Sequence, residues 1–525
     1  MEINRNISTT QLTWIVGTLV GLVMAVFMGS AVGGADFRLV GTVVGVGISV
    51  ATFLVLGKNY WLLIPFSLGA SFPAFPIAGR SLELPELAIP GCALFYLFRV
   101  AFRKEKLTLF RVVNLPILLF VVWVGMVYIL NPIGLAAMGS EFGGGRFYVR
   151  IFLAFLAFII MSNRQYTEQN IRWILGFVLF GAFFSAAYGI ISHFVIGPPL
   201  DSSIMLQDDF YSWHQWVAVP AITATYLLFS RWKCSEIFSL QRAGPLLVYV
   251  VCILMVLFSG KRMAIVAVLI APLVIAAFYR QGAAIFLIVG GGILTFAVVV
   301  LGQGEFYELP LTVQRTVSFL PGNWDPSLSY IEGGQDSFRD ELRLIAMENI
   351  KANPWIGDGF KINIGETAWV SNLQNAQSSS LSTAVGMALG RAWHNTWLGY
   401  AADFGIPLSI LQGVIMIWIT VLSAKVAHRG NNMYVVFSLY VLIKSVMNFV
   451  SSHTGGHTAN DAFEDWWYYG VMAALFTQII FPKNGEVGIK RFTNSESPNL
   501  MSNLYPQIPI RQFNKSGAFR PPATP

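Results

Sequence analysis

A histidine flanked by tryptophans stands where a long polar segment of the chain meets an apolar one. Residues Trp393–Leu398 read Trp-His-Asn-Thr-Trp-Leu. The N-terminus of a helix disfavours an imidazolium, so His394 is expected to be neutral there and able to accept a proton from a hydroxyl group. The alternative is an interfacial histidine packed between tryptophans. The pattern therefore makes His394 a candidate general base.

Pairs of cationic residues occur at two other places. Arg339 and Arg343 are four residues apart in a segment of helical periodicity, so they project from one face. Lys261 and Arg262 lie in a short turn before an apolar stretch. Arginine matches the geometry of phosphate with two parallel N–H groups, so these residues are candidates for binding a diphosphate. The alternatives are pairing with neighbouring carboxylates for the first pair and contact with lipid headgroups for the second.

Three further residues are secondary candidates for lining a pocket. Arg146 and Arg150 are one helical turn apart beside a run of glycines, and His214 stands at the start of an apolar stretch. A positively charged entrance would suit an anionic lipid, whereas contact with headgroups or anchoring at the interface is the alternative.

A third group of polar residues, His453, His457 and Asp461, has a spacing compatible with metal ligands. The glycines between the two histidines favour a polar loop that faces a substrate instead. We predict no metal site and no cofactor.

Composition indicates what kind of elements position these residues. Of 525 residues, 55% are apolar and 12% are charged, against about 25% charged in soluble proteins. Apolar stretches recur that are long enough to cross about 30 Å of hydrocarbon, and lipid requires such stretches to be helical. We predict an all-α, polytopic membrane protein of about 14 transmembrane helices. The predicted spans are 12–32, 39–57, 60–78, 84–101, 112–131, 147–162, 171–193, 213–230, 245–259, 262–279, 283–302, 394–424, 433–451 and 466–481.

The formal charge of +7 follows the predicted topology and does not indicate nucleic-acid binding. Lysine and arginine gather in the links 99–111, 231–242 and 425–429 and in the tail 482–525. All of these fall on one side of the membrane, which the positive-inside rule assigns to the cytoplasm. Both termini are then cytoplasmic, and the candidate residues lie on the periplasmic side.

The chain divides into four predicted parts. Residues 1–302 hold about 11 transmembrane helices, residues 303–393 form a periplasmic loop, residues 394–481 hold about three helices, and residues 482–525 form a disordered cytoplasmic tail. The loop contains an amphipathic helix that begins with Ser337 as its cap and ends at Asn353-Pro354. Its apolar stripe is suited to lying on the membrane-embedded body. The stripe consists of Phe338, Leu342, Ile345 and Ala346.

Three motifs in this order resemble the O-antigen ligase and Wzy-type polymerase family of bacterial surface-glycan enzymes. The first is the turn Ser259–Arg262, which has one residue more than the family's Ser-x-Arg. The second is the helix headed by Arg339 with its Pro-x-x-Gly-x-Gly end at Pro354–Gly359. The third is His-Asn-x-aromatic-Leu from His394, followed by Asp403 and Gly405, where the family usually has Glu before the Gly. The resemblance covers about residues 205–425.

The resemblance implies metal-independent glycosyl transfer from undecaprenyl-diphosphate-linked glycan at the periplasmic face of the inner membrane. Arg262 and Arg339, with Lys261 and Arg343, would hold the diphosphate, and His394 would activate the acceptor hydroxyl. Asn395 or Asp403 would fix the nearby helix.

Three functions remain open. A polymerase would build O-antigen or exopolysaccharide, a ligase would transfer the glycan to lipid A-core or another acceptor, and a transporter would move a lipid-linked glycan. Enzymes of this kind often work beside a flippase and a chain-length regulator.

Overall fold

The structure is a computed structural model. It describes residues 55–69, 75–77, 80–102, 104–105, 107, 112–133, 145–195, 216–239, 243–360, 388, 391, 393–453 and 458–481. By its contacts the chain forms two compact units, Met1–Phe481 and Pro482–Pro525. All the elements below belong to the first unit. The predicted spans 12–32 and 39–57 lie almost entirely outside the described residues, and so does the tail.

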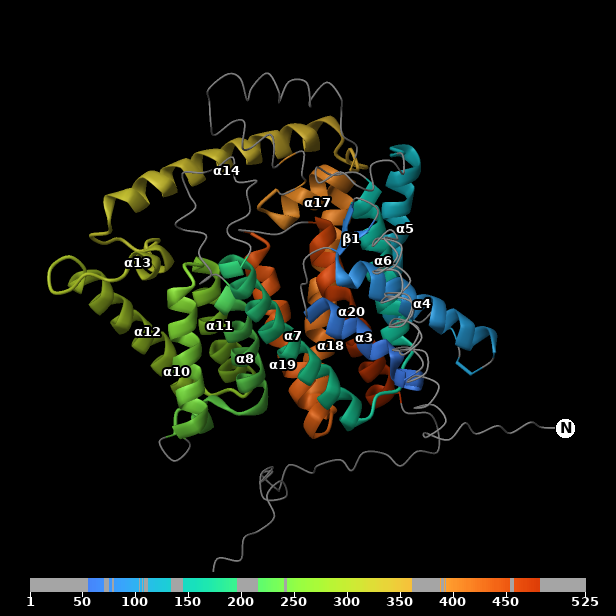
Figure 1. The fold of residues 1–525 in the computed structure, drawn as a ribbon, viewed down its shortest axis with the longest axis horizontal. Coiled ribbons are helices and arrows are strands. Elements are labelled where there is room, and N and C mark those ends of the chain that lie inside the picture. Colours follow the sequence, from blue (N-terminus) through green and yellow to red (C-terminus); the bar gives the residue numbers. More distant parts are fainter. Residues whose placement is uncertain are drawn as a thin grey trace, which may run out of the picture. The chain divides into compact units, whose positions relative to one another are not determined.

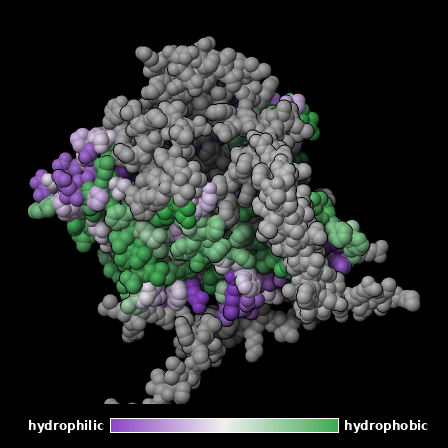
Figure 2. All heavy atoms as spheres, in the orientation of Figure 1, coloured by the Kyte–Doolittle hydropathy of each residue, from purple (hydrophilic) through white to green (hydrophobic). Residues whose placement is uncertain are grey.

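The described part of the chain is helical apart from one short β-hairpin. Seven of its helices are long and apolar enough to cross a membrane. They are α4 (Leu84–Ala101), α5 (Leu115–Leu130) with the preceding 3₁₀ turn η2 (Val112–Asn114), α6 (Gly145–Ser162), α7 (Glu168–Val195), α12 (Gly282–Gly302), α18 (Ile406–Arg429) and α19 (Asn432–Ser451). Figure 2 shows a band of apolar residues across the molecule, with hydrophilic residues below it and at its upper left. The predicted helical, polytopic membrane architecture is thereby confirmed, while the count of 14 stays a prediction.

Four shorter helices and α20 (Thr458–Ile480), which has 23 residues, complete the bundle. The shorter ones are α8 (Ala218–Arg231), α9 (Cys234–Ile237), α10 (Ala243–Phe258) and α11 (Arg262–Phe278). Helix α20 packs along α6, and α18 packs against α19. Trp466 and Trp467 of α20 are fully buried in the resulting core. Lys444 of α19 pairs with Asp465 of α20 at 3.1 Å, which offsets the cost of a charge inside the membrane.

The predicted span 60–78 is wrong. A 3₁₀ helix, η1 (Gly57–Leu62), runs into the short helix α3 (Leu63–Gly69), and the hairpin strands β1 (Phe75–Ile77) and β2 (Arg80–Leu82) follow. Pro76 has no N–H group to continue a helical ladder, and a strand of a two-stranded hairpin tolerates this loss. Apolar composition alone therefore made the segment look like one helix.

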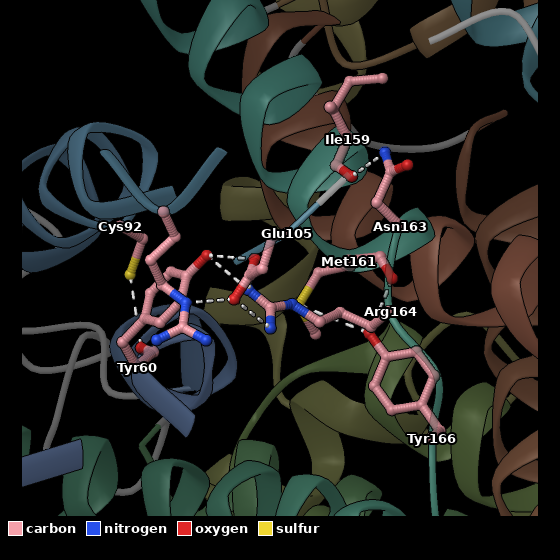
Figure 3. Close-up of polar contacts among 9 residues, drawn as sticks. Tyr60, Cys92, Glu105, Ile159, Met161, Asn163, Arg164 and Tyr166 are labelled. Carbon is pink, nitrogen blue, oxygen red and sulfur yellow. Dashed lines mark hydrogen bonds and ion pairs between the residues drawn. The ribbon is translucent and has the colours of Figure 1, made fainter. Parts of the chain in front are cut away.

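Helices α4 and α6 are packed in parallel, and an ion-pair network closes each end of the pair. At their N-termini, Glu86 accepts hydrogen bonds from Arg146 and Arg150 at 2.8–2.9 Å. At their C-termini, Arg164 donates to Glu105 at 2.8 Å and 3.2 Å (Figure 3). Each helix has 18 residues, so the two networks are about 27 Å apart, close to the thickness of the hydrocarbon core. The charged groups thus lie where the two membrane surfaces are expected.

The Arg164 network is dense. Arg99 also pairs with Glu105, and the guanidinium of Arg164 lies over the ring of Tyr60 and donates to its hydroxyl group. Figure 3 shows Tyr60, Glu105 and Arg164 converging from η1, the link after α4 and the link after α6. The contacts tie η1 to the end of the α4–α6 pair.

The segment after α12 contains two helices. Helix α13 (Leu311–Val317) packs on α10 and α11, and α14 (Pro326–Ala352) crosses the end of the bundle at which α17 lies (Figure 1). The predicted start at Ser337 is wrong, because Asp325 is the N-cap and accepts from Ser327 N, with Pro326 as the first helical residue. The predicted end is confirmed, since Asn353 is the C-cap.

Candidate functional site

The predicted span 394–424 is two helices, α17 (Thr396–Phe404) and α18. Gly405 separates them with φ 84, a left-handed conformation that glycine adopts without strain. Pro407, which lacks an N–H group, lies in the first turn of α18. Predicting one helix here was therefore wrong, and α17, with nine residues, is too short to cross the bilayer.

The Pro354–Gly359 segment fills the break between α17 and α18. Ile406 N donates to Pro354 O at 2.8 Å, and Gly359 N donates to Asp403 O at 2.7 Å. A Cβ atom on Gly405 would overlap the carbonyl oxygen of Trp355, so the two backbones can approach this closely only at a glycine. Two motifs far apart in the sequence thus form one backbone junction.

This junction lies at the Arg146 end of the bundle. Asn131, which follows α5, donates to Gly357 O at 3.5 Å, and the hydroxyl of Tyr148 in α6 accepts from Phe360 N at 3.3 Å. Arg99, in the last turn of α4, belongs to the other end.

Asn395 fixes the N-terminus of α17. Its side-chain oxygen accepts from Leu398 N at 3.0 Å, which is an N-cap. Its amide nitrogen donates to His453 O at 3.3 Å, and Thr396 N donates to Ser452 O at 2.8 Å. The start of α17 is therefore joined to the end of α19.

The loop before α17 holds an unusual backbone in place. His394 has φ 50 and Arg391 has φ 56, values that cost energy for residues other than glycine and that occur often at functional sites. Asp403 is fully buried in α17 and accepts from Arg391 at 3.2 Å and from Trp393 Nε1 at 3.1 Å. Asp403 therefore anchors this loop to α17 through both Arg391 and Trp393.

Helix α14 brings its arginines over this loop. Leu342 and Ala346 are buried against Trp393, Ala401 and Ala402, so the predicted apolar stripe does pack on the membrane-embedded body. Phe338 of the stripe lies among residues whose side chains are not described. The packing orients the neighbouring face of α14, which bears the two arginines, towards the start of α17.

A pocket lies between these elements. It is lined by Arg339, Arg343, Trp393, His394 and His453, and its cavity volume is about 70 Å³. Small-molecule sites span roughly 300–1,000 Å³, so this pocket can hold the reacting groups and not a whole glycan chain. Arg343 also pairs with Asp340 at 3.1 Å, but both side chains are more than half exposed, so a bound anion can displace this weak pair. The structure thus unites His394 with Arg339 and Arg343.

Lys261 and Arg262 are not among the residues that line this pocket. Arg262 begins α11 and donates to Arg315 O at 3.3 Å and to the hydroxyl of Ser318 at 3.1 Å, which ties α11 to α13. Lys261 is the N-cap of α11 and is exposed. A short connection leads from Ser318 to α14.

Arg146 and Arg150 bind carboxylates that sequence reasoning did not connect with them. Besides Glu86, Arg150 pairs with Glu83, and both carboxylates lie at the start of α4. His214 lies outside the described residues. Within the part of the chain that is described, no group of three or more potential metal ligands lies close together.

Sequence reasoning missed Arg391 and did not connect His453 with His394. Arg391 precedes the histidine motif in the sequence, and the apolar helix predicted to follow contains Asp403. An arginine next to such a helix is a signal from which an ion pair with Asp403 could have been predicted. His453 was expected in a polar loop that faces a substrate, but three helices, α17, α18 and α19, separate it from His394, and only the fold brings the two to one pocket.

Residues 247–412 match the family described as O-antigen ligase, and no curated protein matches the chain. The matched segment contains all three motifs, from the turn at Ser259–Arg262 to Gly405. The resemblance to O-antigen ligase is thus confirmed over this segment. It supports a multi-pass membrane enzyme that acts in polysaccharide assembly.

Proposed function

We propose that the protein is a glycosyltransferase that takes its donor, a glycan on undecaprenyl diphosphate, into the pocket under α14. The pocket itself carries this proposal, since it places a histidine beside two arginines from a different motif. Diphosphate is a leaving group already activated for transfer. It needs cations to receive its negative charge and a base to deprotonate the acceptor.

His394 takes the proton of the acceptor hydroxyl as that oxygen forms a bond to the anomeric carbon of the donor. The bond from this carbon to the diphosphate breaks, and its electron pair leaves with the diphosphate. Arg339 and Arg343 neutralise the charge that develops there. The proposal thus assigns to arginines the part that a metal ion plays in other transferases. Lys261 and Arg262, at the α11–α13 contact, are proposed as a second cationic contact for the donor.

The proposed topology puts the pocket in the periplasm, with both termini in the cytoplasm of a bacterial inner membrane. In support of this, the junction formed by Pro354–Gly359 and Gly405 lies at the Arg146 end of the bundle, where Asn131 and Tyr148 contact it. Arg99, in the last turn of α4, lies at the other end, and the positive-inside rule assigns the basic link 99–111 to the cytoplasm. Lipid-linked glycans of this kind would reach the pocket from the bilayer, after delivery by a flippase and under control of a chain-length regulator.

The acceptor distinguishes two forms of this function. Our first proposal is a polymerase, which joins repeat units of O-antigen or exopolysaccharide. The alternative is a ligase, which transfers glycan to lipid A-core or another acceptor, and the description of the matched family favours it. Transport of the lipid-linked glycan is a further alternative. A transport site is expected near the bilayer midplane, whereas the pocket residues lie at one end of the bundle.

Purified protein incubated with lipid-linked oligosaccharides extracted from native membranes tests the proposal. A ladder of longer lipid-linked glycans indicates a polymerase, and product formed only after addition of lipid A-core indicates a ligase. Both activities should be absent in Arg339→Ala and His394→Ala variants that retain the elution volume of the wild type. Wild-type rates in both variants would refute the assignment of the pocket.

A further inference from the structure

We propose that His453 binds the acceptor sugar and orients its reacting hydroxyl towards His394. This inference rests on the proposed glycosyl transfer and adds a substrate-binding residue to it. His453 lines the same pocket as His394, Arg339 and Arg343, although it lies beyond the segment that matches the O-antigen ligase family.

The backbone of His453 is held beside the histidine motif. It follows the C-cap of α19, Ser452, whose carbonyl accepts from Thr396 N at 2.8 Å. The carbonyl of His453 itself accepts from the side chain of Asn395 at 3.3 Å. Asn395 therefore caps the helix that begins after His394 and also holds His453, so the two histidines keep a fixed relation.

The imidazole of His453 is also fixed. Its ring centroid lies 5.5 Å from that of Phe449 and 5.9 Å from that of Trp397, and Nδ1 is 3.0 Å from the carbonyl oxygen of Phe449. A carbonyl oxygen can only accept, so Nδ1 carries the proton and the neutral ring keeps Nε2 as a hydrogen-bond acceptor. The side chain is exposed, which leaves Nε2 accessible to a ligand.

This chemistry fits a sugar better than a diphosphate. The arginines of the pocket have only donors, which suit phosphate oxygens, whereas an imidazole Nε2 accepts from a hydroxyl group. A sugar presents several neighbouring hydroxyl groups. If one donates to His453, an adjacent one can face His394, so His453 sets which hydroxyl reacts. The aromatic rings of Phe449 and Trp397 hold the imidazole in this orientation.

Three substitutions separate this role from packing. His453→Asn can keep a donor for the Phe449 carbonyl but lacks a group at the Nε2 position, and His453→Gln places an amide near the Nε2 position. His428→Asn is the matched control, because His428 is an exposed histidine near the end of α18 that stacks on Phe278 outside the pocket. Transfer is measured with native lipid-linked oligosaccharide as donor and with the acceptor that the wild type uses. The KM for acceptor and the inhibition constant of undecaprenyl diphosphate are determined.

We expect His453→Asn to raise the acceptor KM about tenfold, equal to about 1.4 kcal/mol, with the inhibition constant within twofold of the wild type. His453→Gln should recover most of the loss, and His428→Asn should match the wild type. An unchanged acceptor KM in His453→Asn overturns the inference alone, and so does an equal rise in both constants, which would mean diphosphate binding. Absence of transfer by the wild type instead overturns the proposed function and this inference with it.

If His453→Asn does not fold, Asn395→Asp provides the second test. The carboxylate still caps α17 through Leu398 N but cannot donate to the carbonyl of His453. A rise in acceptor KM at an unchanged inhibition constant is expected. An acceptor KM equal to that of the wild type would count against the inference.

Discussion

Two Arg–Asp ion pairs of nearly equal length allow the loop that carries His394 to be tested. Arg391 and Asp403 are 3.2 Å apart and nearly inaccessible, whereas Arg343 and Asp340 are 3.1 Å apart and more than half exposed. Removing one partner of a buried pair costs about 3–5 kcal/mol because the other charge stays buried, while an exposed pair contributes about 0–1 kcal/mol. The difference in burial, at constant distance, thus predicts a large difference in stability.

We therefore expect Asp403→Ala to lower the apparent melting temperature in detergent micelles far more than Asp340→Ala. Asp403 also accepts from Trp393 Nε1, so the variant should lose transfer activity even below its melting temperature, as the strained backbone at His394 relaxes. The double variant Asp403→Asn with Arg391→Gln removes both charges and should be less destabilising than the sum of its two single changes. Equal shifts for Asp403→Ala and Asp340→Ala, or strict additivity of the double variant, would refute this account of the loop.

Two further predictions concern the frame around the site. Gly405→Ala should destabilise the protein severely, because its φ is 84 and a Cβ would overlap the Trp355 carbonyl; Gly291→Ala, where nothing lies within 4 Å, should leave the apparent melting temperature unchanged. Similar shifts for both variants would argue against the observed junction. Glu86→Gln should cost about 3 kcal/mol, since it leaves two arginines without their shared carboxylate, whereas the exposed Glu305→Gln should cost less than about 0.5 kcal/mol. A wild-type melting temperature for Glu86→Gln would contradict the ion-pair network.

Local sequence patterns predicted the elements that are continuous in lipid. The thickness of the hydrocarbon core sets the length of a spanning helix. Length and hydropathy therefore identify apolar runs such as 84–101 and 433–451. The rule failed at 60–78 and at 394–424, because apolar composition does not register where backbone hydrogen bonds are interrupted. At Gly405 the sequence Gly-Ile-Pro indicated a break in the helix, but the length of the apolar segment 394–424 favoured a single span.

The site was predictable to the extent that it lies in local motifs. Spacing put Arg339 and Arg343 on one helix face, and the apolar stripe beside them packs as predicted, so these residues reached the same pocket as His394. The partners of Arg146 and the place of His453 depend on contacts between distant helices, which one sequence does not reveal. The separation of Arg262 from the residues that line the pocket could not be predicted for the same reason.

The central claim is that the arginines hold the donor diphosphate while His394 carries out proton transfer. Binding of undecaprenyl diphosphate and the transfer rate at saturating donor, measured on the same Arg339→Ala and His394→Ala proteins, test it most directly. The account predicts that His394→Ala binds as tightly as the wild type but transfers about 10²–10⁴-fold more slowly, and that Arg339→Ala loses binding. Loss of binding in His394→Ala, or unchanged binding in Arg339→Ala, would contradict it.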